Sequence, residues 1–222
     1  MTLPALIDKQ DTFEIVRDQL ALLLANEIAN QKALATAGGK DPALWDIKIY
    51  AERSNPWEQY LNQNPVTTPI ANVWFDSEVF DPRRSNVVES QTATGTFNID
   101  VYGYGVASED GTGQQVSDKN AALEVNRALR LIRNILMAAE NTYLQLTRGT
   151  AWDRMPQTIT VYQPELDNRP LQNIRAARMV FNVTYNEFSP QVPGDTLEYL
   201  AVDIKRAEDG SIIAEADYQY PL

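Results

Sequence analysis

The sequence predicts an α+β protein with an antiparallel sheet and two main helices packed on one face of it. Two segments, residues 11–35 and 118–147, carry apolar residues at helical spacing. Several other segments alternate apolar and polar residues, which is typical of strands with one buried side. Helices cover such a sheet on its apolar face. We also expect a long protruding hairpin and a C-terminal β-hairpin extension.

The first predicted helix covers residues 11–35. Asp11 is a suitable N-cap, and Glu14 completes a capping-box pattern. Gly38 and Gly39 follow the last apolar position and end the helix. The apolar positions at helical spacing are Phe13, Val16, Leu20, Leu23, Leu24 and Ile28. This stripe predicts a helix that packs on the core.

A strand and a short helix are predicted next. Residues 44–54, LWDIKIYAERS, alternate apolar and polar side chains as a strand does. Asn55 can cap a helix, Pro56 suits its first position, and Glu58 completes a second capping box. We therefore expect about two turns of helix between two strands.

Two long strands follow at residues 69–80 and 92–106. Asp81-Pro82 breaks the first strand, and the polar segment RRSNVVESQ connects it to the second. Two long strands joined by so short a loop predict an extended hairpin that rises beyond the core.

The second of these strands has two contrasting sides. Its apolar side carries Gly95, Phe97, Ile99, Val101, Gly103 and Gly105. Its polar side carries Thr94, Thr96, Asn98, Asp100, Tyr102 and Tyr104. We expect that the polar side is not a core face, and that it meets other protein or lines a passage. Tyr102 and Tyr104 are the preferred interface candidates, because tyrosine is enriched at protein contacts.

A glycine-containing loop and the longest predicted helix come next. The loop ASEDGTGQQVS lacks the Gly-Lys-Ser/Thr ending of a phosphate-binding loop. The helix over 118–147 has an apolar stripe of Ala122, Val125, Leu129, Ile132, Leu136, Ala139 and Tyr143. Arg127, Arg130 and Arg133 form a second, basic stripe. That stripe is either a solvated helix face or a docking surface for an acidic neighbour, including another copy of this acidic chain.

Two further strands are predicted at residues 156–166 and 171–188. In the second, one side carries Ala177, Met179, Phe181, Val183 and Tyr185. The other side carries Ile174, Ala176, Arg178, Val180, Asn182, Thr184 and Asn186. This repeats the pattern of one apolar and one polar side, so we place both strands in the same antiparallel sheet.

The segment SPQVPGDT predicts a boundary between residues 1–189 and an extension over 190–222. Within the extension, two alternating segments flank Asp209-Gly210, a strong hairpin signal. An isolated two-stranded hairpin is marginal in water. It therefore either folds back onto its own sheet or pairs with a neighbouring subunit by strand addition.

Composition excludes most enzyme chemistries. The chain has no cysteine and no histidine, so disulfides, thiolate sites and histidine bases or ligands are ruled out. The carboxylate pairs Asp76/Glu78 and Asp203/Glu208 lack a nucleophile or metal-ligand partner. We expect no enzymatic activity, cofactor or metal. The formal net charge of -11 argues against wrapping nucleic acid. No apolar stretch is long enough for a membrane span, and no secretory signal is recognised, so we expect a cytoplasmic origin.

In its order of elements the chain resembles the tail terminator (tail completion) proteins of tailed bacteriophages. The matching features are the helix at 11–35, the segment IYAERSNPWEQY, the hairpin at 69–106, the helix at 118–147 and the strands after it. The match covers most of residues 8–188. It is a match of element order, not of an active-site signature.

This resemblance implies a virion structural protein that forms a ring, usually of six copies, on the end of the tail tube. Such a ring stops tube polymerisation and joins the tail to head or neck proteins. In contractile tails it also meets the last tail sheath ring. DNA would pass through the channel without specific binding, and the acidic composition agrees with a repelling wall. Assembly would take place in the host cytoplasm, without a membrane.

By the same resemblance, several residues become interface candidates. The loop residues Arg83, Arg84, Ser85 and Asn86 would contact a ring neighbour or the tube, the alternative being a solvated loop. Arg127, Arg130 and Arg133 would form ion pairs between subunits. The C-terminal hairpin, with Ile204, Ile212 and Tyr218, would reach an adjacent subunit or a sheath or neck partner. A head–tail connector of similar α+β composition, and a cofactor-free enzyme that uses carboxylates, are the alternative functions.

Overall fold

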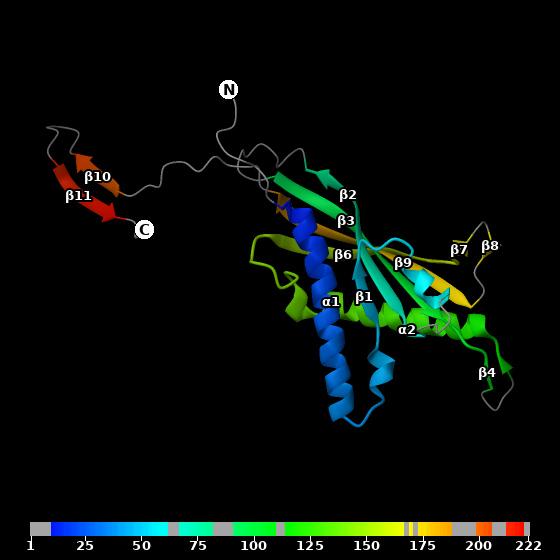
Figure 1. The fold of residues 1–222 in the computed structure, drawn as a ribbon. Helices are drawn as coiled ribbons and strands as arrows, with labels where there is room; N and C mark the ends of the chain where they lie inside the picture. Colours follow the sequence, from blue (N-terminus) through cyan, green and yellow to red (C-terminus); the bar gives the residue numbers. More distant parts are fainter. Residues whose placement is uncertain are drawn as a thin grey trace. The chain divides into compact units, whose positions relative to one another are not determined.

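The structure is a computed structural model, and the chain in it divides into two units. Residues 9–189 form one unit, and residues 190–222 belong with residues 1–8 to the other. The larger unit has an α+β fold (Figure 1). The residues that the structure describes are 10–61, 67–81, 91–109, 114–166, 169–170, 173–187, 199–205 and 212–219.

The larger unit contains a five-stranded sheet and two long helices. Its helical elements are α1 (Thr12–Ala37), η1 (Pro42–Trp45), η2 (Pro56–Leu61), α2 (Ser117–Met137) and η3 (Ala139–Asn141), of which the three η elements are 3-10 helices. The strands of the sheet are β1 (Lys48–Ala51), β2 (Ile70–Phe80), β3 (Gln91–Tyr104), β6 (Ala151–Tyr162) and β9 (Ile174–Glu187). Two short ladders lie outside it, β4 (Ser108–Glu109) with β5 (Gln114–Gln115) and β7 (Glu165–Leu166) with β8 (Arg169–Pro170).

The strand order in the sheet is β1-β2-β3-β9-β6. The pairs β2–β3, β3–β9 and β9–β6 are antiparallel, whereas β1 runs parallel to β2. The predicted all-antiparallel sheet is therefore wrong at this edge, and the sheet is mixed. The reason is the connection through η2, which returns the chain to the end of the sheet where β1 began, so that Lys48 lies opposite Ile70.

The predicted long hairpin is present as the antiparallel pair β2–β3, from Ile70 opposite Tyr102 to Phe80 opposite Ala93. Strand β3 is also paired with β9 along its whole length, from Gln91 to Tyr104. The described part of the hairpin is therefore integrated in the sheet, because β9 supplies a partner on the other side. The connecting residues, with Arg83, Arg84, Ser85 and Asn86, lie outside the described residues.

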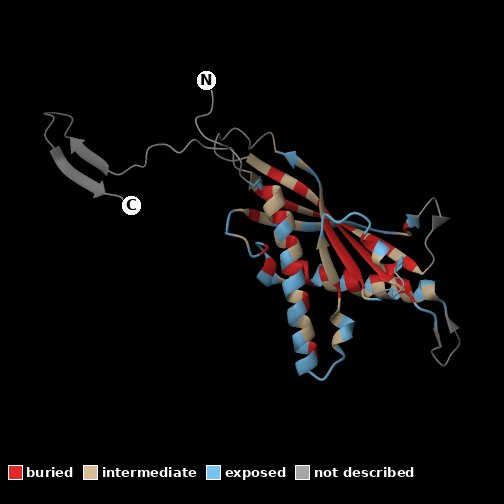
Figure 2. Cartoon of the chain, viewed as in Figure 1, coloured by how far each residue is buried: buried red, intermediate tan, exposed pale blue. Residues whose placement is uncertain are grey.

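Both long helices pack on the same face of the sheet, as predicted. Their buried residues form one core with the apolar side of β3 and β9, and Figure 2 shows the burial concentrated in these central strands. From α1 the core takes Val16, Leu20, Leu23, Leu24 and Ile28, and from α2 it takes Val125, Ala128, Leu129, Ile132, Ile135 and Leu136. The predicted capping box is present at the start of α1, where Glu14 accepts the backbone N–H of Asp11 at 3.0 Å.

Helix α2 ends at Met137, ten residues before the predicted end. Ala138 takes an extended backbone (φ -60°, ψ 143°), which no α-helix continues. The side chain of Arg154 on β6 donates hydrogen bonds to the carbonyl oxygens of Leu136 and Ala138, both at 2.7 Å. These carbonyls at a helix C-terminus lack helical partners, and a cation there also favours the helix dipole.

At its N-terminus, α2 approaches β3 so closely that the apolar side of β3 needs glycine. A Cβ built on Gly105 would lie 1.9 Å from the carbonyl oxygen of Ser117 and 2.5 Å from the nitrogen of Ala121. A Cβ on Gly103 would lie 2.8 Å from the carbonyl oxygen of Ala121. Gly103 and Gly105 therefore make room for the helix backbone.

The smaller unit contains the predicted C-terminal hairpin, formed by β10 (Tyr199–Lys205) and β11 (Ile212–Gln219). The turn at Asp209-Gly210 lies outside the described residues. In the described segments these two strands form a two-stranded sheet of their own.

Across the described ranges, no helix combines the length and the hydropathy that crossing a membrane requires.

Candidate functional site

One end of the polar sheet face is covered by η2. Trp57 and Tyr60 of η2 pack against Tyr102, with Ile70, Ile174 and Ala176, in a second buried cluster. The Tyr60 hydroxyl donates to the carbonyl oxygens of Thr68 at 3.0 Å and Tyr102 at 3.1 Å, and burial raises the pKa of Tyr60. The expectation that this face is not a core face is therefore wrong here. Tyr102 is only 5% exposed, so it packs inside the chain instead of presenting its ring to a partner.

Next to this cluster, Asp100 is held by two donors from neighbouring strands. Arg178 on β9 donates from Nε and Nη2 to the two carboxylate oxygens at 2.7 and 2.9 Å, and Trp74 Nε1 on β2 donates at 2.9 Å. The guanidinium lies over the rings of Trp74 and Tyr162, 4.9 and 5.9 Å from their centroids. The bond to Asp100 is the largest cause of the raised pKa of Arg178. This carboxylate is satisfied inside the sheet, which suits a structural role better than acid–base chemistry.

The other end of the polar face remains a surface of Thr and Asn. Strand pairing sets Thr92 opposite Asn186 and Thr94 opposite Thr184. The side chains of the first pair are hydrogen-bonded at 3.4 Å and those of the second at 3.2 Å. All four residues are half-buried. This half of the face is uncharged and polar, as the sequence predicts.

The structure brings two predicted interface residues, Tyr104 and Arg127, to one pocket beside the N-terminal half of α2. Tyr104 stacks on Tyr60 with ring centroids 5.5 Å apart. The Arg127 side chain is 16% exposed and forms an ion pair with Glu124 one helical turn earlier. Arg127 is therefore paired within its own chain through Nη2, and the inter-subunit ion pair at this position stays a prediction.

Arg130 and Arg133 are both exposed on α2, unlike Arg127. Residues three positions apart on an α-helix fall 60° short of a full turn around its axis. Each arginine in the basic stripe therefore points in a different direction from the one before it, and the later two point away from the core. The docking of an acidic partner on these two exposed arginines stays a prediction. Ile204, Ile212 and Tyr218 lie in β10 and β11, where the structure describes the strand pairing and not the side chains.

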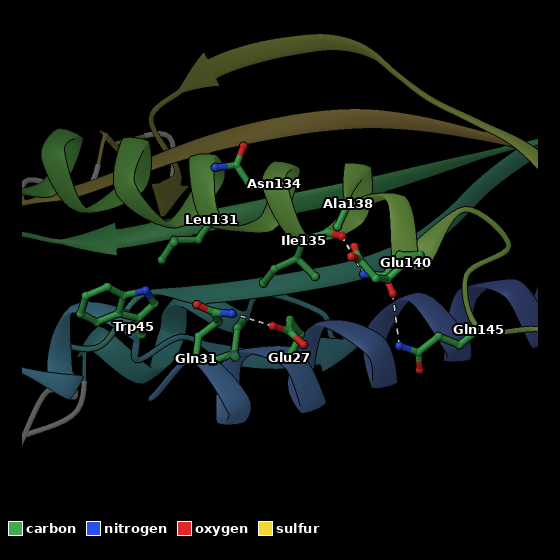
Figure 3. A pocket seen from close by; sticks show the side chains of 11 residues that line it. Glu27, Gln31, Trp45, Leu131, Asn134, Ile135, Ala138, Glu140 and Gln145 are labelled. Atoms are coloured by element: carbon green, nitrogen blue, oxygen red, sulfur yellow. Dashed lines mark hydrogen bonds between the residues drawn. The ribbon is translucent and has the colours of Figure 1, made fainter. Parts of the chain in front are cut away.

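A second pocket, of about 370 Å³, lies between α1 and α2 (Figure 3). Glu27 and Gln31 from α1 face Leu131 and Ile135 from α2, and the indole of Trp45 lies at one end. Gln31 donates to Glu27 at 2.7 Å. Trp45 was predicted in a strand and instead belongs to η1, which places its ring at this pocket. The lining holds carboxylates and amides but no nucleophile with a base beside it.

Strand β6 is predicted from the sequence, but its position at the edge of the sheet is not. It is the last strand of the sheet, and in the described residues only β9 pairs with it. Met155, Ile159 and Val161 are exposed on it. The alternation of PQTITVYQPEL predicts the strand, but its position at the edge depends on the order of strands in space. Exposed apolar residues on a free sheet edge favour protein contacts.

Two of the four carboxylates singled out in the sequence, Asp76 and Glu78, form ordinary hydrogen bonds. Glu78 accepts the hydroxyl of Tyr185 at 2.7 Å, and Asp76 accepts that of Ser77 at 3.3 Å. Glu208 lies outside the described residues. Within the described ranges, no three acidic side chains gather as metal ligands do.

No protein-family model and no curated protein matches the chain. The element order and the exposed surfaces are what bear on its function.

Proposed function

We propose that this protein is a structural component of a bacteriophage tail, whose copies close into a ring on the end of the tail tube. The ring ends polymerisation of the tube and joins the tail to the head or neck. The observation that carries the proposal is the element order of the larger unit, α1, β1, η2, β2, β3, α2 and then two long strands, followed by a separate hairpin. This is the order on which the resemblance to tail terminators rests.

The exposed surfaces support an assembly protein. Strand β6 has no partner on its outer side in the described residues, and it carries exposed apolar residues. Such an edge promotes aggregation of a monomeric protein, whereas in an assembling protein it can form a subunit contact. Arg130 and Arg133 are exposed in a chain of net charge -11, so a second copy offers them acidic partners. The described carboxylates that could act in catalysis are instead bound within the chain.

The proposed partners follow from the place of the ring. One face contacts the tail tube protein, and the other contacts a head–tail connector or neck protein. In a contractile tail the ring also meets the last sheath ring. DNA passes through the lumen without specific binding, since an acidic wall repels the phosphate backbone. The protein then belongs to the tail or neck of the virion after assembly in the host cytoplasm.

Light scattering and electron microscopy of the purified full-length protein test the proposal. We expect a closed ring whose mass is a small multiple of the chain mass, six by the resemblance, or a monomer that forms rings on the ends of added tail tubes. Binding to the head connector but not to tubes would indicate a connector protein instead. A monomer at high concentration that ignores tail tubes would contradict the proposal.

A further inference from the structure

We propose that the β10–β11 hairpin of one copy adds to the free edge of β6 in a second copy, at Thr158–Tyr162. The two subunits are then joined by main-chain hydrogen bonds across one continuous sheet. This inference rests on the proposed ring, which it supplies with a subunit contact.

The receiving edge is the C-terminal half of β6. Its N-terminal half carries the usual protections of an edge strand, namely bulges at Ala151/Asp153 and Pro156/Thr158 and the proline itself. From Thr158 to Tyr162 the register with β9 is regular. This stretch has the sequence Thr-Ile-Thr-Val-Tyr, which is uncharged and consists of residues with high β-propensity. A regular, uncharged edge of this kind is a template for a further strand.

Two apolar side chains on this edge are exposed to solvent. Ile159 is 48% exposed and Val161 is 59% exposed. They lie opposite Met179 and Ala177, which are buried under the helices, so they belong to the helix-bearing face of the sheet. The helices cover the central strands but leave this edge open. A strand added beside β6 with its apolar side on the same face would cover both residues.

The hairpin has the alternation that this edge requires. Its register places three apolar pairs on one face: Leu200 with Tyr218, Val202 with Ala216, and Ile204 with Ala214. The intervening pairs on the other face are Ala201 with Asp217 and Asp203 with Glu215. A two-stranded sheet is marginal by itself, so the hairpin gains stability from a third strand.

In this alignment, the acidic residues of the hairpin lie on the same sheet face as Arg178. When its apolar face continues the face of Ile159 and Val161, the face of Asp203, Glu215 and Asp217 continues the one that carries Arg178. The Arg178 side chain is 39% exposed, so its guanidinium is accessible to further carboxylates. Opposite charges on one face favour this orientation of the hairpin over the inverted one.

A second copy is the occupant that fits, because each chain carries one donor hairpin and one receiving edge. Pairing one copy's hairpin with the next copy's edge is a head-to-tail contact, and such contacts generate rings when the rotation closes. Pairing within one chain would occupy both elements and leave nothing to bind a neighbour.

Cysteine cross-linking tests the contact, because the natural chain has no cysteine. Full-length Ile159→Cys is mixed with full-length Ala216→Cys and oxidised, and the same is done with Ile159→Cys and Ala214→Cys to sample an adjacent register, because these positions lie on the shared apolar face in the proposed alignment. We expect a disulfide-linked dimer of the two different chains. Ala51→Cys, on β1 at the opposite edge of the sheet, is the matched control and should not cross-link to the hairpin variants.

The double variant Ile159→Cys/Ala216→Cys separates the two pairings. We expect it to form covalent oligomers. If it forms only a disulfide within one chain while the mixed single variants stay uncrosslinked, the hairpin adds to its own β6 and the proposal is overturned. Rings that give no cross-link in any register also overturn it, but leave the proposed function standing. Cross-linked chains that never close into rings support the strand contact and count against the ring.

A surface variant gives a second readout. Val161→Lys adds a charge at an exposed position, so the fold tolerates it, and Val161→Thr keeps the shape and β-propensity as a control. We expect the lysine variant to lower the yield of the cross-link between Ile159→Cys and Ala216→Cys about tenfold, because a charge on an edge strand opposes the addition of a further strand. Far-UV circular dichroism checks that both variants are folded. An unchanged yield in folded Val161→Lys would exclude this edge.

Discussion

Asp100 on β3 and Arg178 on β9 lie directly opposite each other, and the guanidinium donates to both oxygens of the carboxylate at 2.7 and 2.9 Å. The Asp100 side chain is 5% exposed, so water contributes little to its hydrogen bonding. With Trp74 as the third donor, the pair ties together β2, β3 and β9 in the middle of the polar face. At the centre of the polar face, these side chains are therefore hydrogen-bonded to one another and do not form an open polar surface.

Removal of this guanidinium should destabilise the larger unit. In Arg178→Met the buried carboxylate keeps only the donor from Trp74, and we expect the free energy of unfolding to fall by about 1–3 kcal/mol. Urea unfolding followed by circular dichroism measures it. Arg130→Met, at an exposed position on α2, is the control and should change stability by less than about 0.5 kcal/mol. Equal stability of the two variants would mean that the Asp100 pair contributes little.

The buried tyrosines predict a loss of stability at alkaline pH. Burial is the largest cause of the raised pKa values of Tyr60, Tyr102 and Tyr185. A raised pKa means that the folded state keeps protons that the unfolded state has lost. Their contribution is therefore complete below the unfolded pKa of about 10 and falls above it, by up to about 1.4 kcal/mol per pH unit for each tyrosine.

Urea unfolding at about pH 9 and about pH 11, on either side of the ordinary tyrosine pKa, measures this slope. Tyr185→Phe removes one titrating group and should make the decline shallower, although it also loses the hydrogen bond to Glu78 at every pH. Identical slopes in the natural chain and in Tyr185→Phe would show that Tyr185 does not contribute to the alkaline loss of stability.

The side chain that ends α2 offers a third prediction. Arg154 bonds the carbonyl oxygens of Leu136 and Ala138, so Arg154→Met should lower the free energy of unfolding by about 1–2 kcal/mol. Arg154→Lys keeps the charge but cannot reach both carbonyls in the same forked geometry, and an intermediate loss is expected. Thermal unfolding measures the order. Lysine and methionine variants of equal stability would show that the charge at the helix end is unimportant.

The sequence was most informative where local chemistry decides the structure. The capping box at Asp11 and the glycine at Gly38 place α1 within two residues of its prediction. The alternation of β9 correctly predicts its buried residues from Ala177 to Tyr185, whereas Ile174 and Ala176, assigned to the polar side, are buried in the cluster with η2. The predicted end of α2 was wrong because Arg154, distant in sequence, supplies the stop. The apolar stripe alone does not show where that side chain lies.

Contacts between segments that are distant in sequence determine the remaining features, including which candidate interface residues are exposed. Tyr102 and Arg127 were assigned to surfaces from residue type, but η2 covers the first and Glu124 pairs with the second. The parallel pairing of β1 depends on the path of the chain through η2. The exposed edge at β6 follows from strand order. Each of these needs the arrangement of several segments in space, which no single stretch of sequence encodes.

The close approach of α2 to β3 makes Gly105 a sensitive position. In Gly105→Ala the new Cβ meets backbone atoms of Ser117 and Ala121 that cannot rotate away, so we expect a loss of about 3 kcal/mol or more. Gly149→Ala is the control, since nothing lies within 4 Å of its Cβ position. Its positive φ of 97° should cost only about 1–2 kcal/mol. Urea unfolding ranks the two, and a larger loss for Gly149→Ala would contradict the observed helix–strand spacing.

Deletion of residues 195–222 separates folding from assembly. The larger unit has its own core, and the hairpin forms a sheet of its own, so the truncated protein should unfold at nearly the temperature of the full chain. We expect the deletion to abolish ring formation in light scattering, because the donor strands are gone. Val202→Glu in the full-length chain is the matched variant: it keeps the hairpin's length but places a charge on its apolar face, and should weaken assembly in the same way. If the truncated protein instead fails to fold, the hairpin completes the core of its own chain, and a subunit contact through it becomes untenable.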